Sequence, residues 1–329
     1  TYVWAADNSF MSQIRTDGRF KVIQDEGNRA NVGTETYGWL LGDEIDMCCG
    51  PPGFAGGNGY TMIQNVLNSL PADNRARYAN YGKGVLLWES DSDAAKFING
   101  PNGNNSFQQI VSADLYWFTD PNENGNSRKG FGSSYGTDVA RMRMLDNMDG
   151  VRQPVWAFVE TGWPFTESAS QGGRAIQPAE MRSAAWHALI GGARGIIYFQ
   201  HSFGGPCVGD HHTTRSNCEG TRPMLITLNA QIKGLAPVLN SPFVTSGHSA
   251  TGDVRYTVKW NGSNFYVFAG ANRGGGSATF SVPCVGNATA TVLDESRSVT
   301  ISNGSFSDSF ADKNAVHLYR IDGGSRCGL

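Results

Sequence analysis

Two glutamates each follow a short apolar segment and could supply the two carboxyl groups of one reaction. In YGWLLGDEIDMCCGPPG, residues 37–53, the apolar residues end before Asp43 and Glu44. In PVWAFVETGWP, residues 154–164, they end at Glu160. Two carboxyl groups in one site can take different roles, one as a proton donor and one in the ionised form, when their environments differ. The two segments therefore predict a single site formed by the ends of two strands.

The elements that must position these glutamates are predicted by the pattern of apolar residues. In the first two-thirds of the chain the candidate strands are apolar throughout, which indicates that both faces of their sheet are covered. Segments of helical spacing lie between them, which favours parallel βα units. The expected strands are 1–7, 20–27, 37–44, 76–82, 111–118, 154–160 and 194–202, and the expected helices are 9–16, 59–70, 138–148, 178–192 and 223–235.

This pattern amounts to about seven βα units, whereas a closed (β/α)8 barrel has eight. We therefore expect an α/β fold, a (β/α)8 TIM barrel whose first βα unit is missing from the N-terminus. An open doubly wound sheet is the alternative, but no GxGxxG sequence follows a strand and no phosphate loop is present.

The last third of the sequence has a different pattern of polar and apolar residues. From about residue 238 to residue 322, short segments of alternating polarity are separated by NGS, RGGG and NG turns. Regularly spaced short strands of this kind are typical of a β-sandwich. The expected domains are a barrel over residues 1–237 and an accessory β-sandwich over residues 238–329.

The composition favours an extracellular protein that handles sugars. The net charge is -3, so no basic field would attract nucleic acid or an anionic membrane. Charged residues make up only 17% of the chain, aromatic residues make up 11%, and 42 residues are glycine. No apolar run is long enough to span a bilayer, and no signal peptide is recognisable. We expect a secreted monomer that binds carbohydrate and needs no cofactor or metal.

Six cysteines without a CxxC pair indicate disulfides rather than a zinc site. Cys207 and Cys218 bracket a short polar loop and are expected to pair. Cys284 and Cys327 are the cysteines of the last third, which leaves a vicinal Cys48–Cys49 pair, although the sequence alone leaves the connectivity open. Possible N-glycosylation sequons begin at four asparagines, Asn104, Asn261, Asn287 and Asn303.

Polar side chains gather at the expected strand ends, where a barrel has its active site. Carboxylates and amides dominate these positions, and tryptophans lie in or beside them. An indole ring can pack against the C–H face of a sugar, while carboxylates and amides bind its hydroxyl groups. The candidate substrate-binding residues are Trp4, Asp25, Asp43, Asn80, Tyr116, Trp163, Gln200 and His201.

These residues give the chain a resemblance to the clan A glycoside hydrolases. That resemblance implies a (β/α)8 barrel with an acid/base glutamate after strand 4 and a nucleophilic glutamate after strand 7. If the first strand is missing, YGWLLGDE corresponds to strand 4 and PVWAFVE to strand 7, so Glu44 and Glu160 fall on the two catalytic positions. The segment ARGIIYFQHSF resembles strand 8, and the sandwich resembles the β-domain that often follows such barrels.

The resemblance implies a retaining mechanism in which Glu160 attacks the anomeric carbon and Glu44 protonates the leaving oxygen. The clan usually has asparagine before the acid/base glutamate, where this chain has Asp43. An adjacent negative charge raises the pKa of Glu44, which suits a proton donor. Asp43 and Asp46 are the competing donors, and Tyr116 and His201 are candidates to hydrogen-bond Glu160.

Two other functions are compatible with parts of the sequence. A non-catalytic glycan-binding protein on the same scaffold could lose either glutamate, so the presence of both favours an enzyme. A metal-dependent hydrolase needs His and Asp ligands on several strand ends, and only His201 stands at such a place. The run from Asp210 to His212 lies between two cysteines in a polar loop and is read as surface.

Overall fold

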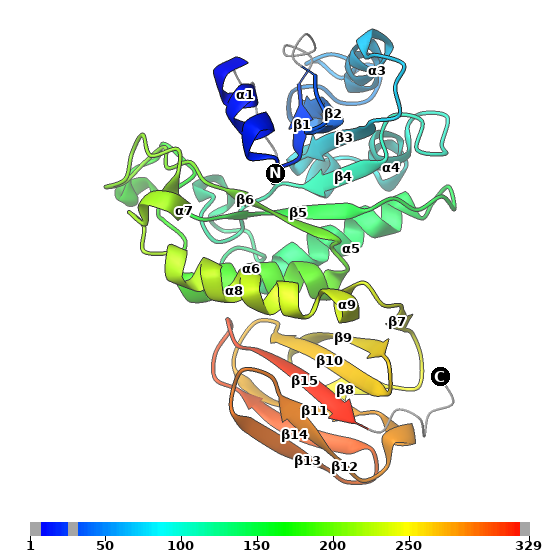
Figure 1. Ribbon diagram of the computed structural model, residues 1–329, viewed down its shortest axis with the longest axis vertical. Helices are drawn as coiled ribbons and strands as arrows, with labels where there is room; N and C mark the ends of the chain where they lie inside the picture. Colours follow the sequence, from blue (N-terminus) through cyan, green and yellow to red (C-terminus); the bar gives the residue numbers. More distant parts are fainter. Residues whose placement is uncertain (1–7, 26–31, 323–329) are drawn as a thin grey trace. The chain divides into compact units, whose positions relative to one another are not determined.

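The computed structural model describes residues 8–25 and 32–322, and the chain forms two compact units (Figure 1). The first unit comprises residues 1–115, 138–158 and 193–197, and the second comprises 116–137, 159–192 and 198–329. The predicted strand 1–7 and its Trp4 lie outside the described residues. The proposed domain boundary at 237–238 falls within the short helix α9 (Ala236–Leu239).

A sheet of six strands follows the order of the sequence, as expected for successive βα units (Figure 1). Neighbouring strands pair in parallel from β1 through β5. Each of the six strands coincides with a predicted one, which confirms the α/β barrel architecture. The strands are β1 (Val22–Gln24), β2 (Thr36–Asp43), β3 (Ala76–Tyr81), β4 (Ile110–Ala113), β5 (Val155–Glu160) and β6 (Gly195–Phe199).

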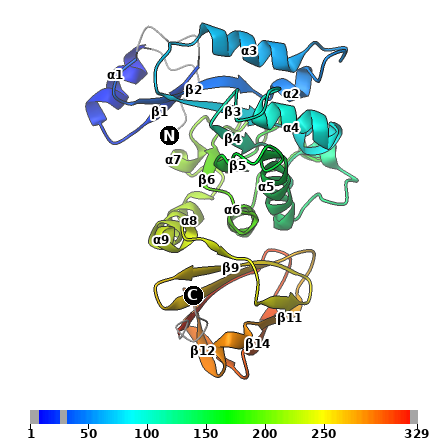
Figure 2. The same cartoon turned by 90° about the vertical axis from the view of Figure 1, so that its right-hand side faces the viewer.

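Helices separate these strands along the chain, and within the first unit α3 lies against β2 (Figure 2). In the same unit α4 packs against the short π-helix η2. Five of the longer helices were predicted. The described helices are α1 (Asn8–Asp17), α2 (Ile45–Cys48), α3 (Gly59–Ser69), η2 (Gly84–Trp88), α4 (Asp91–Asn99), η3 (Pro121–Glu123), α5 (Gly132–Asp146), η4 (Ala169–Gln171), α6 (Pro178–Gly191), α7 (Thr213–Ser216) and α8 (Arg222–Gly234).

Helix α4 was not predicted, although its first turn carries a clear start signal. The Ser90 side chain accepts a hydrogen bond from the backbone N–H of Asp93 at 3.2 Å. Asp91 and Asp93 place negative charge beside the free N–H groups of the first turn, which stabilises a helix start. A serine cap followed by acids thus marks this helix despite its short apolar pattern.

The strand predicted over residues 111–118 ends earlier than expected, at Ala113. Residues beyond that point leave the sheet, although the backbone N–H of Asp114 still donates to the carbonyl of Tyr81 at 2.9 Å. Asp114, rather than Tyr116, therefore follows the strand end. The apolar run was misleading because Leu115, Tyr116 and Trp117 are buried without being part of a strand.

The apolar core of the sheet in the first unit contains residues from four successive strands. Ile23, Leu40, Tyr78 and Ile110 come from β1 to β4 and form one buried cluster. The ring of Tyr78 lies 5.6 Å from that of Trp156 on β5. Burial of such side chains is the main favourable term in holding the strands together.

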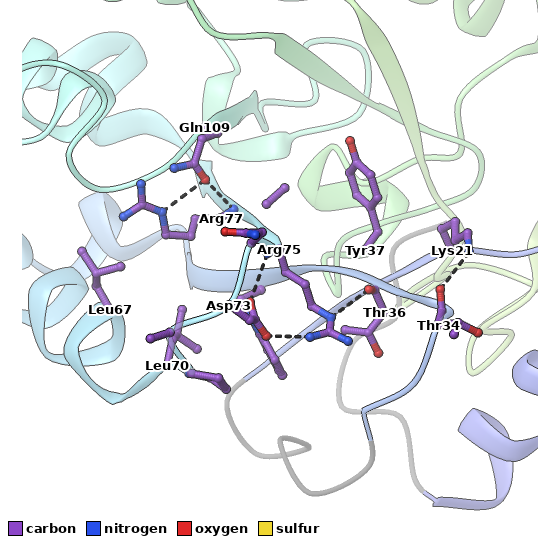
Figure 3. A pocket seen from close by; sticks show the side chains of 15 residues that line it. Lys21, Thr34, Thr36, Tyr37, Leu67, Leu70, Asp73, Arg75, Arg77 and Gln109 are labelled. Carbon is purple, nitrogen blue, oxygen red and sulfur yellow. Dashed lines mark hydrogen bonds and ion pairs between the residues drawn. The ribbon is translucent and has the colours of Figure 1, made fainter.

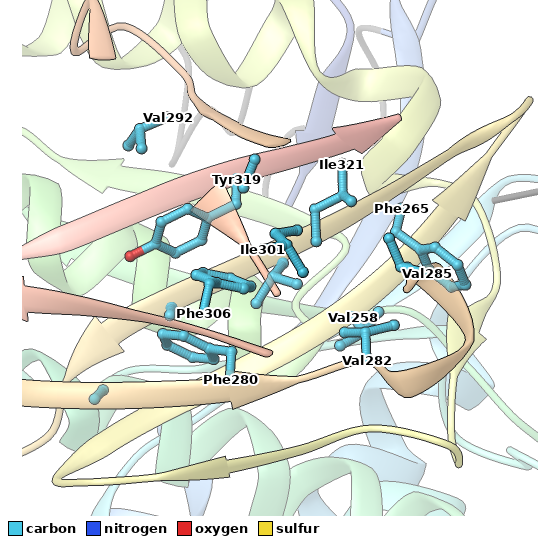
Figure 4. Packing of buried hydrophobic residues seen from close by; sticks show 14 of the residues in the cluster. Val258, Phe265, Phe280, Val282, Val285, Val292, Ile301, Phe306, Tyr319 and Ile321 are labelled. Atoms are coloured by element: carbon cyan, nitrogen blue, oxygen red, sulfur yellow. The ribbon is translucent and has the colours of Figure 1, made fainter. Parts of the chain in front are cut away.

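The second unit contains the predicted β-sandwich, built of one sheet in the order β13-β12-β15-β10-β9-β7 and one in the order β14-β11-β8. Phe280 and Phe306 stack with their ring centroids 5.1 Å apart in its core (Figure 4). Strand β14 was missed because SFSDSF is mostly polar, yet its two phenylalanines alternate inward. The described elements are β7 (Phe243–Val244), β8 (Ser249–Thr251), β9 (Val254–Asn261), β10 (Asn264–Ala271), β11 (Gly276–Ser281), η5 (Pro283–Val285), β12 (Ala288–Val292), β13 (Arg297–Ile301), β14 (Ser305–Phe310) and β15 (Val316–Asp322).

Helix α6 packs on strands β9 and β10 within the second unit. His187 of this helix is fully buried, and its Nε2 lies 3.0 Å from the carbonyl oxygen of Ala271. Burial lowers the pKa of His187 to about 3, so the imidazole is neutral. Trp186 packs beside Phe268, with ring centroids 5.4 Å apart. His187 is thus part of the core of this unit.

Two of the expected disulfides are present, Cys48–Cys49 and Cys207–Cys218. The third predicted pair involves Cys327, which lies outside the described residues. Among the described residues, the helices are all too short or too polar to cross a bilayer.

Candidate active site

Glu44 stands at the turn between β2 and α2. Its backbone is left-handed, with φ 49° and ψ 35°, a conformation that non-glycine residues rarely adopt. The backbone N–H of Glu44 donates to the carbonyl of Asn80 at 2.9 Å, which ties the turn to the neighbouring strand β3. Strained positions of this kind tend to occur at functional sites.

The side chain of Asn80 on β3 joins two carboxylates, one from the end of each neighbouring strand, β2 and β4. Its Nδ2 donates to Asp43 at 2.8 Å and to Asp114 at 2.9 Å. Its oxygen accepts from the hydroxyl of Ser112 at 2.5 Å, and that hydroxyl in turn contacts the hydroxyl of Tyr78. Asn80 is only 1% exposed. A buried and fully engaged amide therefore fixes two aspartates beside Glu44.

Glu44 is protonated at neutral pH in this environment. Its pKa is raised to about 9, first by burial and then by the negative charges of Asp114, Asp43 and Asp46, against a smaller opposing effect of Lys83. Burial also raises the pKa of Asp43, although its hydrogen bond from Asn80 acts in the other direction. A carboxyl group that keeps its proton at pH 7 is equipped to act as a general acid.

Asp46, one of the two competing donors, has a structural environment. Its carboxylate accepts the backbone N–H of Gly82 at 3.1 Å and that of Val85 at 2.8 Å, and it is 1% exposed. Burial raises its pKa to about 6, while these hydrogen bonds lower it. Asp46 thus anchors the loop between β3 and η2.

Glu160 ends strand β5 in the second unit and is fully buried. The hydroxyl of Tyr135 on α5 donates to its two carboxylate oxygens at 2.8 and 2.7 Å, and the hydroxyl of Thr119 donates to one of them at 3.0 Å. Burial raises the pKa of Glu160 to about 7, whereas the hydrogen bonds from Tyr135 and Thr119 lower it. These two hydroxyls stabilise the ionised carboxylate in an apolar environment.

The hydrogen-bond donors expected for Glu160 were Tyr116 and His201, and the structure gives them other contacts. The ring of Tyr116 packs against Phe199 with centroids 5.5 Å apart. His201 has its Nδ1 2.9 Å from Nδ1 of His211, and burial lowers its pKa. Tyr135 and Thr119 are the donors to Glu160 instead, because α5 and the segment after β4 supply the residues that pack around the end of β5.

The remaining predicted substrate-binding residues are spread over both units. Asp25 follows β1 in the first unit and is half-buried. In the second unit Trp163 is partly exposed, and its Nε1 donates to the carbonyl of Glu167 at 3.2 Å. Gln200 accepts a hydrogen bond from the hydroxyl of Thr214. Their contact with substrate stays a prediction.

Sequence reasoning missed Asp114, Thr119 and Tyr135. Asp114 follows a buried four-residue strand, but in the sequence it stands inside the run 111–118, so the rule that exposed Glu44 did not single it out. Thr119 comes directly after the run 111–118 that was assigned to a strand, and it was not considered as a site residue. Tyr135 lies in the first turn of a helix and gives no local signal, since its position beside Glu160 depends on packing.

A cavity of about 820 Å³ lies at the amino-terminal edge of the first strands, the edge opposite Asp43 and Asp114 (Figure 3). Its cationic side chains are already engaged by the protein. Arg75 pairs with Asp73 at 2.6 Å, Arg77 donates to Gln109 at 3.2 Å, and Lys21 donates to a backbone carbonyl at 2.8 Å. The cationic side chains that line this cavity therefore do not indicate a particular ligand.

In the described part of the chain, no three His, Cys, Asp or Glu side chains are arranged to hold a metal ion. In the surface loop between Cys207 and Cys218, the carboxylate of Asp210 accepts the backbone N–H of His212 at 2.8 Å and the hydroxyl of Ser216. The Asp210 carboxylate is thus used within the loop, while His211 contacts His201 outside it.

The parallel sheet has the architecture of a (β/α)8 barrel, and the solved structures that resemble the chain in fold are glycoside hydrolases. A GH27 β-L-arabinopyranosidase from Geobacillus stearothermophilus matches 95% of this chain with a TM-score of 0.51 and 10% identity. A variant of AmyP in complex with maltotriose matches 98% of this chain and 80% of its own, with a TM-score of 0.52 and 11% identity. A family 30 subfamily 8 xylanase from Clostridium acetobutylicum matches 98% of this chain and 88% of its own, with a TM-score of 0.46 and 12% identity.

At such identities the first two likenesses show the fold alone. The chain spans about 60% of the length of the arabinopyranosidase. No protein-family model and no curated protein matches the sequence.

Proposed function

We propose that the protein is a retaining glycoside hydrolase of clan A that acts on an extracellular oligo- or polysaccharide. The observation that carries this proposal is the environment of Glu44, a carboxyl group that holds its proton at neutral pH beside two fixed aspartates at the carboxyl edge of a parallel sheet. A glycosidase needs such an acid, because the leaving alkoxide is otherwise too basic to depart.

In the proposed first step Glu160 attacks the anomeric carbon and Glu44 protonates the glycosidic oxygen. The bond from the anomeric carbon to that oxygen breaks as the bond to Glu160 forms. In the second step the ionised Glu44 takes a proton from water, and the water displaces Glu160 with a second inversion. This mechanism requires the two carboxyl groups to be about 5 to 5.5 Å apart in the working enzyme.

The hydroxyls of Tyr135 and Thr119 support the nucleophile assignment, because they favour the ionised form of Glu160. Asp43 and Asp114 support the acid assignment, because their negative charges oppose ionisation of Glu44. The two glutamates thus have environments that serve different roles, as the mechanism demands.

The test is hydrolysis of a panel of glycans and nitrophenyl glycosides by the wild type and two variants. Glu160→Gln should lose about 10⁴-fold or more of kcat on every substrate. Glu44→Gln should lose about 10²- to 10⁴-fold on glycans, but much less on nitrophenyl glycosides, whose leaving group needs no proton. NMR of the first product should show retention of anomeric configuration. Undiminished hydrolysis by Glu160→Gln, or inversion, would contradict the proposal.

A second candidate is a glycan-binding protein without catalytic activity. The observation that favours it is the complete burial of Glu160, since a nucleophile must touch the anomeric carbon. If this candidate is right, the wild type binds a glycan in calorimetry but hydrolyses none of the panel. The proposal of a glycoside hydrolase also includes secretion, a monomeric state and carbohydrate as the only partner. The location of the native protein tests secretion, and light scattering tests the monomeric state.

A further inference from the structure

Asp114 stands in a fixed relation to the candidate acid. In the sheet, Asp43 is the register partner of Asn80, and Asn80 is the register partner of Ser112. Asp114 follows two residues after Ser112, and its backbone N–H continues the β3–β4 ladder by donating to Tyr81. The hydrogen bonds of Asn80 to the Ser112 hydroxyl and to the Asp114 carboxylate show that both side chains are directed to the Asn80 side chain.

The amide of Asn80 has one orientation in this arrangement. Its oxygen accepts from Ser112, so its nitrogen must face the carboxylates. Because the Ser112 hydroxyl donates to Asn80, the hydroxyl of Tyr78 is the donor in the Tyr78–Ser112 contact at 2.5 Å. The nitrogen then gives its two N–H groups to Asp43 and Asp114. The whole set is anchored by a chain of buried hydrogen bonds.

We infer that Asp114 is a positioning residue of the site, and that its carboxylate, held by Asn80 beside Asp43, keeps the proton on Glu44 until the leaving group takes it. This inference rests on the proposed function. The charged groups that face Glu44 are Asp43 on β2, Asp46 on α2, Lys83 after β3 and Asp114 after β4. Among the three aspartates, Asp114 has the largest effect on the pKa of Glu44, after burial itself.

The substitution Asp114→Asn removes the charge and keeps the shape. The new amide oxygen can still accept from Asn80, so the hydrogen-bond chain persists. The titration of Glu44 is followed by NMR in protein labelled at the glutamate side-chain carboxyl carbon, with Glu44→Gln to assign its signal. Its midpoint should fall by roughly one to two pH units in Asp114→Asn. Asp91→Asn is the matched control, because it removes the same charge from α4 of the same unit and should leave the midpoint unchanged.

The pH profile of kcat/KM gives a second readout on the best substrate of the panel. The basic limb, set by the proton on Glu44, should move down by the same amount in Asp114→Asn, while the acidic limb stays in place. The conservative variant Asp114→Glu retains the charge and should restore most of the wild-type profile. Circular dichroism and the thermal midpoint check that each variant is folded.

The outcomes separate this inference from the proposed function. If the Glu44 titration shifts in Asp114→Asn but the protein hydrolyses no glycan, the result supports the inference about Asp114 and contradicts the proposed glycoside hydrolase activity. If the wild type hydrolyses a glycan but the Glu44 titration is unchanged in Asp114→Asn, the result contradicts the inference about Asp114 and supports the proposed glycoside hydrolase activity. Loss of hydrolysis at every pH with an unmoved titration also overturns it, because Asp114 would then act on the sugar directly.

Discussion

Tyr135 donates its hydroxyl to both carboxylate oxygens of Glu160, at 2.8 and 2.7 Å. Tyr135 lies in the first turn of α5 and Glu160 at the end of β5, and both are fully or nearly fully buried. A buried carboxylate without such a donor would hold its proton firmly. The Tyr135 hydroxyl therefore decides whether Glu160 can be ionised near neutral pH.

Replacing Tyr135 by phenylalanine should raise the pKa of Glu160 above its value of about 7, because a hydrogen bond to the charged form is lost. If Glu160 is the nucleophile, the acidic limb of the kcat/KM profile moves up by about one pH unit. Tyr198→Phe is the matched control, since it removes a hydroxyl that bonds Asn229 at the surface. An unmoved acidic limb in a folded Tyr135→Phe variant would argue against this role.

Glu160 should also make stability depend on pH. Its pKa is about 7 in the folded protein and has the ordinary value of 4.5 in the unfolded chain, so between these pH values the folded state holds a proton that the unfolded chain releases. The free energy of unfolding should therefore fall as the pH rises from 4.5 through about 7. Over this range the loss from Glu160 alone is roughly 3 kcal/mol.

Glu160→Gln removes the titrating group, so comparison with the wild type isolates the contribution of Glu160 to the pH dependence of stability. Urea unfolding at pH 5 and pH 8 should show a smaller difference between the two conditions in the variant than in the wild type. Equal differences in the two proteins would mean that Glu160 has the same proton affinity folded and unfolded.

Gly270 on β10 is required for the packing of α6 on the sandwich. A Cβ at this position would lie 2.5 Å from Nε2 of the buried His187. Gly270→Ala should therefore lower the free energy of unfolding by about 1–3 kcal/mol through overpacking. Gly274→Ala is the control, because a Cβ there meets no atom within 4 Å. Urea denaturation of both variants measures the contrast, and equal stabilities would show that the helix can shift without cost.

Asp46→Asn should destabilise the first unit, because its carboxylate serves the backbone N–H groups of Gly82 and Val85. The Gly82 N–H is shared between both carboxylate oxygens at 3.1 Å, so an amide puts an NH₂ donor where one of these acceptors was, and the two facing donors cost about 1–3 kcal/mol. Thermal and urea unfolding measure the loss. Asp91→Asn, on the surface of α4, is the comparison. A stability loss no larger than that of Asp91→Asn would contradict the anchoring role.

The sequence by itself determined the classes of structure in this chain and the places where chemistry could occur. Apolar runs with intervening helical segments predicted the parallel strands. Alternating segments predicted most of the sandwich, because inward and outward positions alternate along a strand. Glu44 and Glu160 were found because an acid at the end of a buried strand contrasts sharply with the residues before it.

Only the tertiary structure decided which side chains surround these acids. Asp114 was hidden by an apolar run that continues past the end of β4, since burial and strand formation leave the same mark in a sequence. Tyr135 meets Glu160 across 25 residues of chain. Contacts of this kind arise from packing between elements. No local pattern encodes them, because the sequence around each partner reflects only the helix or strand in which it lies.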